Sequence, residues 1–133
     1  MYRINPWPFY ETECIEKVSS ILQSGKVNYW TGEEGKCFEK EASDIFDSKY
    51  SIALSNGSVA LTAAYKALQL KENDEIITSP RTFLATSSSA VLLGLNPVFA
   101  DVDINSGCIT SKSIEPLITK KTRAISTDCS KIR

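Results

Sequence analysis

Short apolar segments alternate with helical ones from residue 50 to residue 125, and this alternation limits the fold more than any other feature of the chain. Strands that are joined by helical connections form β-α-β units, in which the strands run parallel and helices cover both faces of the sheet. The pattern predicts strands at 50–54, 75–78 and 97–102 and from residue 123, and helices at 59–70, 83–93 and 111–119, the last interrupted by Pro116. The sequence therefore predicts an α/β fold with a parallel sheet.

Residues 1–49 are predicted to form a separate, N-terminal helical segment. Apolar residues at helical spacing indicate a helix over 11–24, which Gly25 ends, and a second helix over 33–47. The loop between these helices, 26–32, contains aromatic residues. In the second helix we expect five residues to point inward: Cys37, Phe38, Ala42, Ile45 and Phe46.

Residues 126–133 are polar and break the pattern of the α/β segment, 50–125. A domain rarely stops at the beginning of a core strand, because the edge of that strand would be left open. We therefore expect an aberrant or disordered tail, produced by truncation or a frameshift near residue 126; a naturally short protein with a polar tail is the alternative. Since the sheet would then be incomplete, the isolated chain is expected to be marginally stable or oligomeric.

The composition excludes several classes of function. Fifteen Lys and Arg against sixteen Asp and Glu give a net charge of −1, which provides no positively charged surface for nucleic acid or an anionic membrane. No apolar run is long enough to span a bilayer or to form the core of a signal peptide, so a cytoplasmic location without membrane contact is expected. The chain has no His, and its four Cys are widely spaced, so neither a Ser-His catalytic pair nor a metal site is expected.

Two segments that follow predicted strands are candidates for ligand binding. Asn56, Gly57 and Ser58 suit a tight turn with positive φ that opens a helix, whose free N–H groups and dipole attract phosphate. An ordinary β-α turn with a helix cap explains the same residues. Phe83 follows the strand at 75–78, where an aromatic ring could stack on a planar cofactor; alternatively, it is the first core residue of the next helix.

Three stretches of the sequence resemble one family of enzymes. They are Ser24-Gly-Lys-Val-Asn-Tyr-Trp-Thr-Gly32, the stretch Ala53–Leu68, and Asp74–Thr86 followed by Pro97–Asp103. In order and in register, from about Ile4 to Ile125, the chain is similar to the DegT/DnrJ/EryC1/StrS family of pyridoxal-phosphate-dependent sugar aminotransferases. The resemblance implies a partial large domain of the aspartate-aminotransferase type (PLP fold type I), truncated before the sheet is complete.

The resemblance also implies a cofactor and two groups of site residues. The turn at Gly57, Ser58 and Val59 would hold the phosphate of pyridoxal 5'-phosphate (PLP) through backbone N–H groups and the Ser58 hydroxyl, and Phe83 would stack on the pyridine ring. The nucleotide-sugar pocket of the family is built at the interface of a homodimer, near the residues that match Tyr29, Trp30, Thr31 and Gly32.

The catalytic pair of the family is not expected in this chain. The resemblance places the lysine that forms the Schiff base, and the acidic residue that pairs with the pyridine nitrogen, downstream of residue 133, and the chemistry needs both. Asp128 and Lys131 are interpreted as accidental charges of the tail. No catalytic residue is therefore assigned, and the chain alone is expected to be inactive.

Two classes of function stay open. As a family member, the chain derives from an enzyme that transfers an amino group from an amino acid, expected to be glutamate, to a keto nucleotide-sugar in polysaccharide or antibiotic-sugar biosynthesis. As an isolated chain, it is an inactive remnant, or a module that binds phosphate ligands or a full-length partner. Some relatives dehydrate the sugar instead. A Rossmann nucleotide-binding domain is disfavoured, because the glycine fingerprint is missing.

Overall fold

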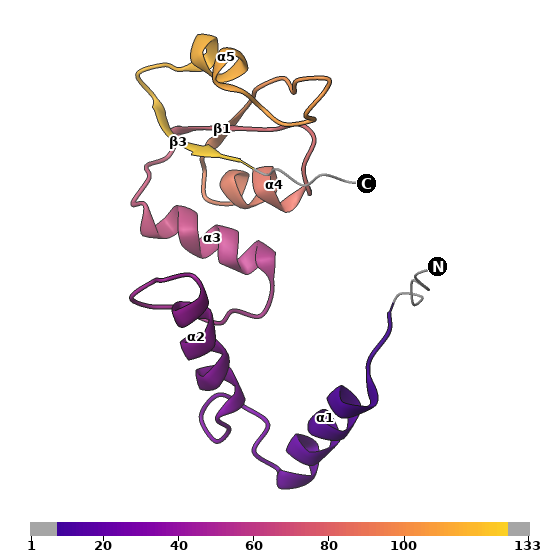
Figure 1. The fold of residues 1–133 in the computed structure, drawn as a ribbon. Helices are drawn as coiled ribbons and strands as arrows, with labels where there is room; N and C mark the ends of the chain where they lie inside the picture. Colours follow the sequence, from indigo (N-terminus) through magenta and orange to yellow (C-terminus); the bar gives the residue numbers. More distant parts are fainter. Residues whose placement is uncertain (1–7, 128–133) are drawn as a thin grey trace, which may run out of the picture. The chain divides into compact units, whose positions relative to one another are not determined.

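The computed structural model describes residues 8–127, and the chain divides into two compact units, the first ending at Ala53 and the second beginning at Leu54 (Figure 1). The first unit is helical, and the second contains the sheet. The predicted tail beyond Thr127, with Asp128 and Lys131, lies outside the described residues.

Two helices, α1 (Thr12–Ser24) and α2 (Glu34–Ile45), make up most of the first unit, as the sequence predicted. Gly25 ends α1: its φ is 71°, and its N–H donates to the Leu22 carbonyl at 3.2 Å. Glycine adopts this left-handed conformation without steric penalty, which is why the helix stops at the predicted residue.

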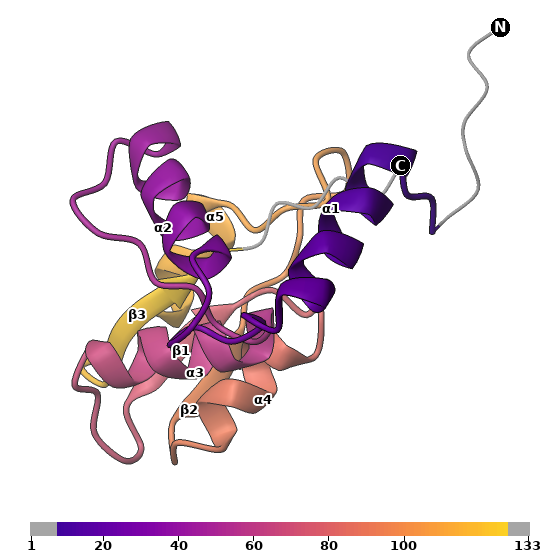
Figure 2. The same ribbon diagram turned by 90° about the horizontal axis from the view of Figure 1, so that it is seen from below.

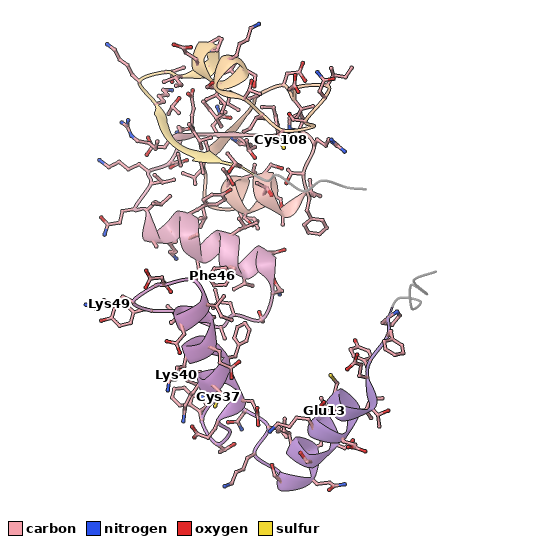
Figure 3. All side chains as sticks on the ribbon, in the orientation of Figure 1. Glu13, Cys37, Lys40, Phe46, Lys49 and Cys108 are labelled. Carbon is pink, nitrogen blue, oxygen red and sulfur yellow. The ribbon has the colours of Figure 1, made fainter. Side chains whose placement is uncertain are left out.

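The apolar side chains of α2 do not point inward as predicted. Cys37, Phe38, Ile45 and Phe46 are exposed, and Ala42 alone of the five is half-buried; Figure 3 labels Cys37 on this helix and Phe46 directly after it. A helix buries an apolar stripe only against another element, and residues 8–53 supply no such covering layer. The helix is therefore amphipathic, but its apolar face is not buried by the described residues of this unit.

Asn28 shapes the aromatic loop between α1 and α2. Its side-chain oxygen accepts the N–H groups of Trp30 and Thr31 at 3.0 and 3.1 Å, and its carbonyl accepts the Gly32 N–H at 2.7 Å. A Cβ added to the buried Gly32 would lie 2.5 Å from the Lys26 carbonyl oxygen, so a larger residue requires a shift of the backbone. The loop is thus a turn that Asn28 and Gly32 close.

Glu39 of α2 holds both the aromatic loop and the last residue of the first unit. Its carboxylate accepts the Tyr29 hydroxyl at 3.0 Å through Oε2 and the Ala53 N–H at 2.8 Å through Oε1. The bond from the phenol to this negatively charged acceptor raises the pKa of Tyr29. The sequence pattern does not reveal Glu39, because its partners are 10 and 14 residues away.

The second unit is built on a parallel sheet of three strands in the order β2-β1-β3. Its central strand, β1 (Glu75–Thr78), pairs with β2 (Asn96–Phe99) on one side and with β3 (Thr122–Ser126) on the other. The predicted parallel sheet is confirmed, and β1 has the predicted bounds. β2 lies at an edge, which is where a strand tolerates a proline such as Pro97.

Helices cover both faces of this sheet, as predicted. α3 (Gly57–Ala67) and α4 (Ala85–Val91) pack beside each other on one face, and the short α5 (Ser111–Ile114) lies on the opposite side (Figure 1, Figure 2). Ile76 and Ile77, which point to opposite faces, are 1% and 0% exposed. The core cluster of buried residues is Tyr65, Ile76, Ala90 and Leu95.

The strand predicted at 50–54 is wrong. These residues have no strand partner in the part of the chain that the structure describes, and Ile52 is exposed. Both hydrogen-bonding edges of β1 are taken by β2 and β3, so this segment does not pair with β1, and residues 50–54 pair with neither edge strand of the described sheet. Alternating apolar and polar residues indicate a segment that can form a strand. Whether it does so depends on partner strands that are distant in the sequence.

The predicted helices of the second unit are present with shifted ends. The helix predicted at 59–70 begins earlier, at Gly57, and the one predicted at 83–93 is shorter at both ends. The segment with Pro116 starts as α5 and continues as a 3-10 turn, Glu115–Leu117. Proline is tolerated at the start of such a turn, where its missing N–H has no hydrogen bond to lose.

Two predicted strands change at their ends. The strand predicted at 97–102 ends at Phe99, and Val102 instead pairs with Ile109 in an isolated antiparallel bridge. The strand predicted from residue 123 begins at Thr122 and includes Ser126, which was expected to begin the tail. Ser126 pairs with Thr78 of β1, so it is part of the sheet.

Replacement of Ile76 by Val should lower the free energy of unfolding by about 1 kcal/mol, because it removes a methylene group from the centre of the core. Ile104→Val is the matched control: Ile104 is 93% exposed, and the same change there should stay within about 0.5 kcal/mol of zero. Denaturant unfolding followed by circular dichroism, at one protein concentration, measures both variants. Equal effects of the two substitutions would contradict the burial of β1.

The hydrogen bond between Tyr29 and Glu39 should make the aromatic loop sensitive to alkaline pH. Because the folded-state pKa of Tyr29 is raised, the bond contributes stability below the ordinary tyrosine pKa, and this contribution is lost as the pH rises through the folded-state pKa. Tyr29→Phe removes the donor and should abolish the dependence, whereas Tyr10→Phe should not. The fluorescence of Trp30, whose ring centroid lies 6.0 Å from that of Tyr29, reports the change in a Trp7→Phe background. An alkaline transition that persists in Tyr29→Phe excludes this bond as its cause.

Candidate functional site

A pocket of about 530 Å³ opens at the carboxyl end of β3, between α3 and the start of α4. Ligands in open α/β sheets bind at this edge. The volume lies within the range of about 300–1,000 Å³ that is usual for small-molecule sites. We call this the sheet-edge pocket; it is lined by Asn56, Gly57, Ser58, Leu61, Phe83, Ala85, Thr86, Ser126 and Thr127.

Asn56 caps α3 at the wall of this pocket. Its side-chain oxygen accepts the Val59 N–H at 3.0 Å, and its carbonyl accepts the Ala60 N–H at 3.1 Å. Among the described residues, no acceptor is found for the N–H of Gly57 or of Ser58. These two N–H groups, together with the positive end of the α3 dipole, provide a position for an anion.

Gly57 does not have the positive φ that the sequence predicted for this turn. The glycines with positive φ are Gly25, Gly94 and Gly107, and the preceding residue, Asn56, is extended. A Cβ added to Gly57 would meet no atom within 4 Å. Backbone conformation and packing thus leave room for a side chain here, and the space beside its N–H is open to a ligand.

Ser58 is anchored through its backbone carbonyl. The hydroxyls of Thr62 and Ser89 donate to this oxygen at 3.0 and 3.3 Å, whereas no hydrogen bond of the Ser58 hydroxyl is found within residues 8–127. Nearby, the buried Tyr65 hydroxyl donates to the Thr86 carbonyl at 3.0 Å and ties α3 to α4. The wall of the pocket is therefore fixed, while the Ser58 hydroxyl is available to a ligand.

Phe83 lies just before α4 and lines the pocket with an exposed ring. Its side chain is 75% exposed, so Phe83 is not the first core residue of the following helix. Its carbonyl accepts the Thr86 N–H at 3.0 Å, which fixes the backbone where α4 begins. An exposed ring in the wall of a pocket offers a flat apolar surface to a planar ligand.

The structure brings most of the predicted cofactor residues together in the second unit. Gly57, Ser58 and Phe83 line the sheet-edge pocket, and Val59 contributes its N–H to the helix cap without lining the pocket. The predicted substrate residues belong instead to the aromatic loop of the first unit: Tyr29, Trp30, Thr31 and Gly32.

Several pocket residues were missed by the sequence analysis. Leu61 and Thr86 lie inside or at the start of helices, where no pattern distinguishes a pocket residue from a core residue. Ser126 and Thr127 lie at the end of β3, where ligands bind in parallel sheets. Their position at the carboxyl end of the strand predicted from residue 123 is the signal that could have identified them.

The lining of the sheet-edge pocket contains neither a lysine nor a carboxylate. Elsewhere among residues 8–127, no group of three or more Cys, Asp or Glu side chains is arranged to hold a metal ion. No helix within these residues is long and apolar enough to cross a membrane. The pocket offers N–H groups, hydroxyls and an aromatic ring, which suit an anionic ligand with a planar part.

Comparison with known proteins finds relatives that are much longer than this chain. The spore coat polysaccharide biosynthesis protein SpsC of Bacillus subtilis is 35% identical over 118 residues, which are 89% of this chain and 30% of that protein. The structure of an aminotransferase from Psychrobacter cryohalolentis matches with a TM-score of 0.89 and 46% identity, over 94% of this chain and 32% of the other. The E. coli GDP-4-keto-6-deoxy-D-mannose-3-dehydratase, solved with bound hydrated PLP, matches with a TM-score of 0.79 and 30% identity, over 96% and 33%.

The chain thus spans about a third of the length of these relatives. The related structures are PLP-dependent enzymes of fold type I, so the predicted fold class, with part of an aspartate-aminotransferase-type sheet, is confirmed. Residues 8–127 match the sequence model of the DegT/DnrJ/EryC1/StrS aminotransferase family, which covers most of the chain. The chain therefore belongs to the DegT/DnrJ/EryC1/StrS aminotransferase family.

Proposed function

We propose that this chain forms the phosphate-binding part of the cofactor site of a PLP-dependent enzyme, which transfers an amino group from an amino acid, with glutamate as the expected donor, to a keto nucleotide-sugar. One observation carries the proposal: the sheet-edge pocket combines the N–H groups of Gly57 and Ser58, which have no acceptor among residues 8–127, with the exposed ring of Phe83. Family membership supports the same chemistry. The cytoplasmic location predicted from the sequence is part of the proposal.

The phosphate of PLP fits the amino end of α3. The N–H groups of Gly57 and Ser58 are two donors without acceptors among the described residues, and the Ser58 hydroxyl is a third donor. Hydrogen bonds to a charged phosphate are about twice as strong as those between neutral groups. The open space beside Gly57 allows the phosphate to approach the backbone.

The ring of PLP fits beside Phe83, which offers an apolar face in the pocket wall. The hydroxyls of Thr86 and Ser126 belong to the same lining, where they can form hydrogen bonds with polar groups of a ligand. When bound, PLP supplies an aldehyde that accepts the amino group and a ring that withdraws electrons. Because the lining contains no lysine, this pocket is expected to hold PLP noncovalently.

For the aromatic loop of the first unit we propose contact with the nucleotide-sugar. Trp30 is 88% exposed, and its ring stands edge-on to that of Tyr29. An exposed aromatic pair on a closed turn offers flat apolar surface to a base or a sugar ring. The name of SpsC supports a surface polysaccharide as the end product, and antibiotic sugars are the alternative.

Two other functions are favoured by specific observations. The similarity to the E. coli dehydratase favours removal of water from the sugar as a second reaction. The lack of a lysine in the pocket lining favours a third function, in which the chain binds phosphate compounds without catalysis. Calorimetric titration with PLP and with inorganic phosphate separates a cofactor site from a general phosphate site. A cofactor site should bind PLP more tightly than inorganic phosphate, because Phe83 contacts the ring. Equal affinities for the two ligands would support binding of phosphate compounds alone.

Gly57→Ala should weaken PLP binding without destabilising the fold. The added methyl group meets no protein atom within 4 Å, but it occupies space in which the phosphate would approach the backbone. We expect the Kd for PLP to rise about tenfold, which corresponds to about 1.4 kcal/mol, and the free energy of unfolding to change by less than about 0.5 kcal/mol. Calorimetric titration with PLP, and with pyridoxal as a control that lacks the phosphate, measures the effect. Equal losses for the two ligands would contradict the phosphate assignment.

The proposal also includes pairing with a second copy of the chain. Few apolar side chains of the described residues are buried, whereas large ones such as Phe46, Leu68 and Leu92 are exposed. Sedimentation velocity should therefore detect a dimer or a larger species that dissociates on dilution. A monomer that unfolds in one cooperative transition argues against pairing.

A further inference from the structure

Residues 102–109 form a small hairpin after β2. Val102 and Ile109 pair in the antiparallel bridge, the Asp103 N–H donates to the Cys108 carbonyl at 3.0 Å, and the Gly107 N–H donates to the Asp103 carbonyl at 2.8 Å. Cys108 is labelled in Figure 3 and marks the position of this hairpin in the second unit. The cross-hairpin hydrogen bonds hold its backbone in one conformation.

Gly107 turns this hairpin and contacts Arg81. Its φ is 68°, in the left-handed region that favours glycine, and its carbonyl accepts a hydrogen bond from Nη1 of Arg81 at 3.5 Å. A Cβ at position 107 would overlap the same guanidinium nitrogen, so the arginine lies directly against the glycine backbone. Since the two residues are 26 apart in the sequence, the contact joins two separate connections of the sheet.

Arg81 belongs to the loop that joins β1 to α4. At the start of this loop, the Arg81 N–H donates to the Ser79 hydroxyl at 3.0 Å. At its end, the hydroxyls of Thr82 and Thr86 lie 3.0 Å apart, and the Phe83 carbonyl accepts the Thr86 N–H. Arg81 therefore lies in the middle of a loop that is fixed at both ends, close in sequence to the ring that lines the sheet-edge pocket.

We propose that Arg81 is a positioning residue for the cofactor ring: its guanidinium, held against the Gly107 backbone, keeps the loop of residues 79–84 in the conformation that places Phe83 in the pocket wall. The inference rests on the proposed PLP site. Arg81 does not line the pocket, so its effect on binding acts through Phe83. A planar guanidinium suits a directed contact to a fixed carbonyl better than a lysine ammonium on its flexible stem.

Amide hydrogen exchange of the full chain without PLP tests whether Arg81 restrains the loop of residues 79–84. In Arg81→Ala, the amides of residues 82–84 should exchange about three- to tenfold faster than in the wild-type chain, because the loop opens more often. Arg123→Ala is the matched control, since it removes an equal charge from β3, where Arg123 pairs with Asp74. Gly107→Ala should reproduce the effect, because its methyl group displaces the guanidinium; Gly94→Ala, at another glycine with positive φ, should not.

Titration with PLP tests the effect on the ring. Arg81→Ala should weaken PLP binding about two- to tenfold, the range expected for one aromatic contact. Phe83→Leu should cause a similar loss, and the double variant should lose no more than Phe83→Leu alone, since both changes act through one ring. Arg81→Lys should bind PLP more tightly than Arg81→Ala but less tightly than the wild-type chain. Binding of inorganic phosphate should be unchanged in these variants.

Additive losses in the double variant, or unchanged exchange in Arg81→Ala, would overturn the role of Arg81 and leave the PLP site in place. Failure of the wild-type chain to bind PLP would instead overturn the proposed function. In that case the exchange comparison decides by itself whether Arg81 holds the loop.

Discussion

The central strand β1 is the element on which the second unit depends. It pairs along both edges, and Ile76 and Ile77 bury one side chain on each face of the sheet. Burial on two faces is the main stabilising contribution of a short parallel strand. The carboxyl end of β1 also leads into the loop with Phe83, and its last residue, Thr78, pairs with Ser126 of the pocket. The candidate site is therefore attached to the best-buried strand of the molecule's described part.

The sheet-edge pocket contains polar groups that the fold itself does not use. Asn56 satisfies the N–H groups of Val59 and Ala60, which lie further along α3, and leaves those of Gly57 and Ser58 without acceptors among the described residues. An unpaired N–H group costs free energy if it is buried, but it costs little at an open pocket, where water or an anion can accept it. The Asn56 cap thus stabilises the helix without occupying the two N–H groups that are proposed to bind phosphate.

Local patterns were sufficient to predict the parallel sheet, because a strand such as β1 and a helix stop such as Gly25 are set by neighbouring residues. The strand at 50–54 was wrong, because strand pairing is decided by segments far away in the sequence. For the same reason, the contacts of Glu39 and Arg81, with partners 10 to 26 residues away, could not be predicted. In the site, Gly57, Ser58 and Phe83 were identified from their positions after predicted strands and from the family resemblance, whereas Ser126 was assigned to the tail.

The two edges of the sheet differ in what they can accept. Asn96 and Ala100 donate their N–H groups toward β1, to the carbonyls of Asp74 and Thr78. Because N–H groups alternate in direction along a strand, that of residue 97 would point away from β1, and Pro97 has none. The outer edge of β2 therefore lacks a donor in its middle, whereas β3 contains no proline. Pairing of a further strand is therefore disfavoured beside β2, and no proline of β3 opposes such pairing on the other side of the sheet.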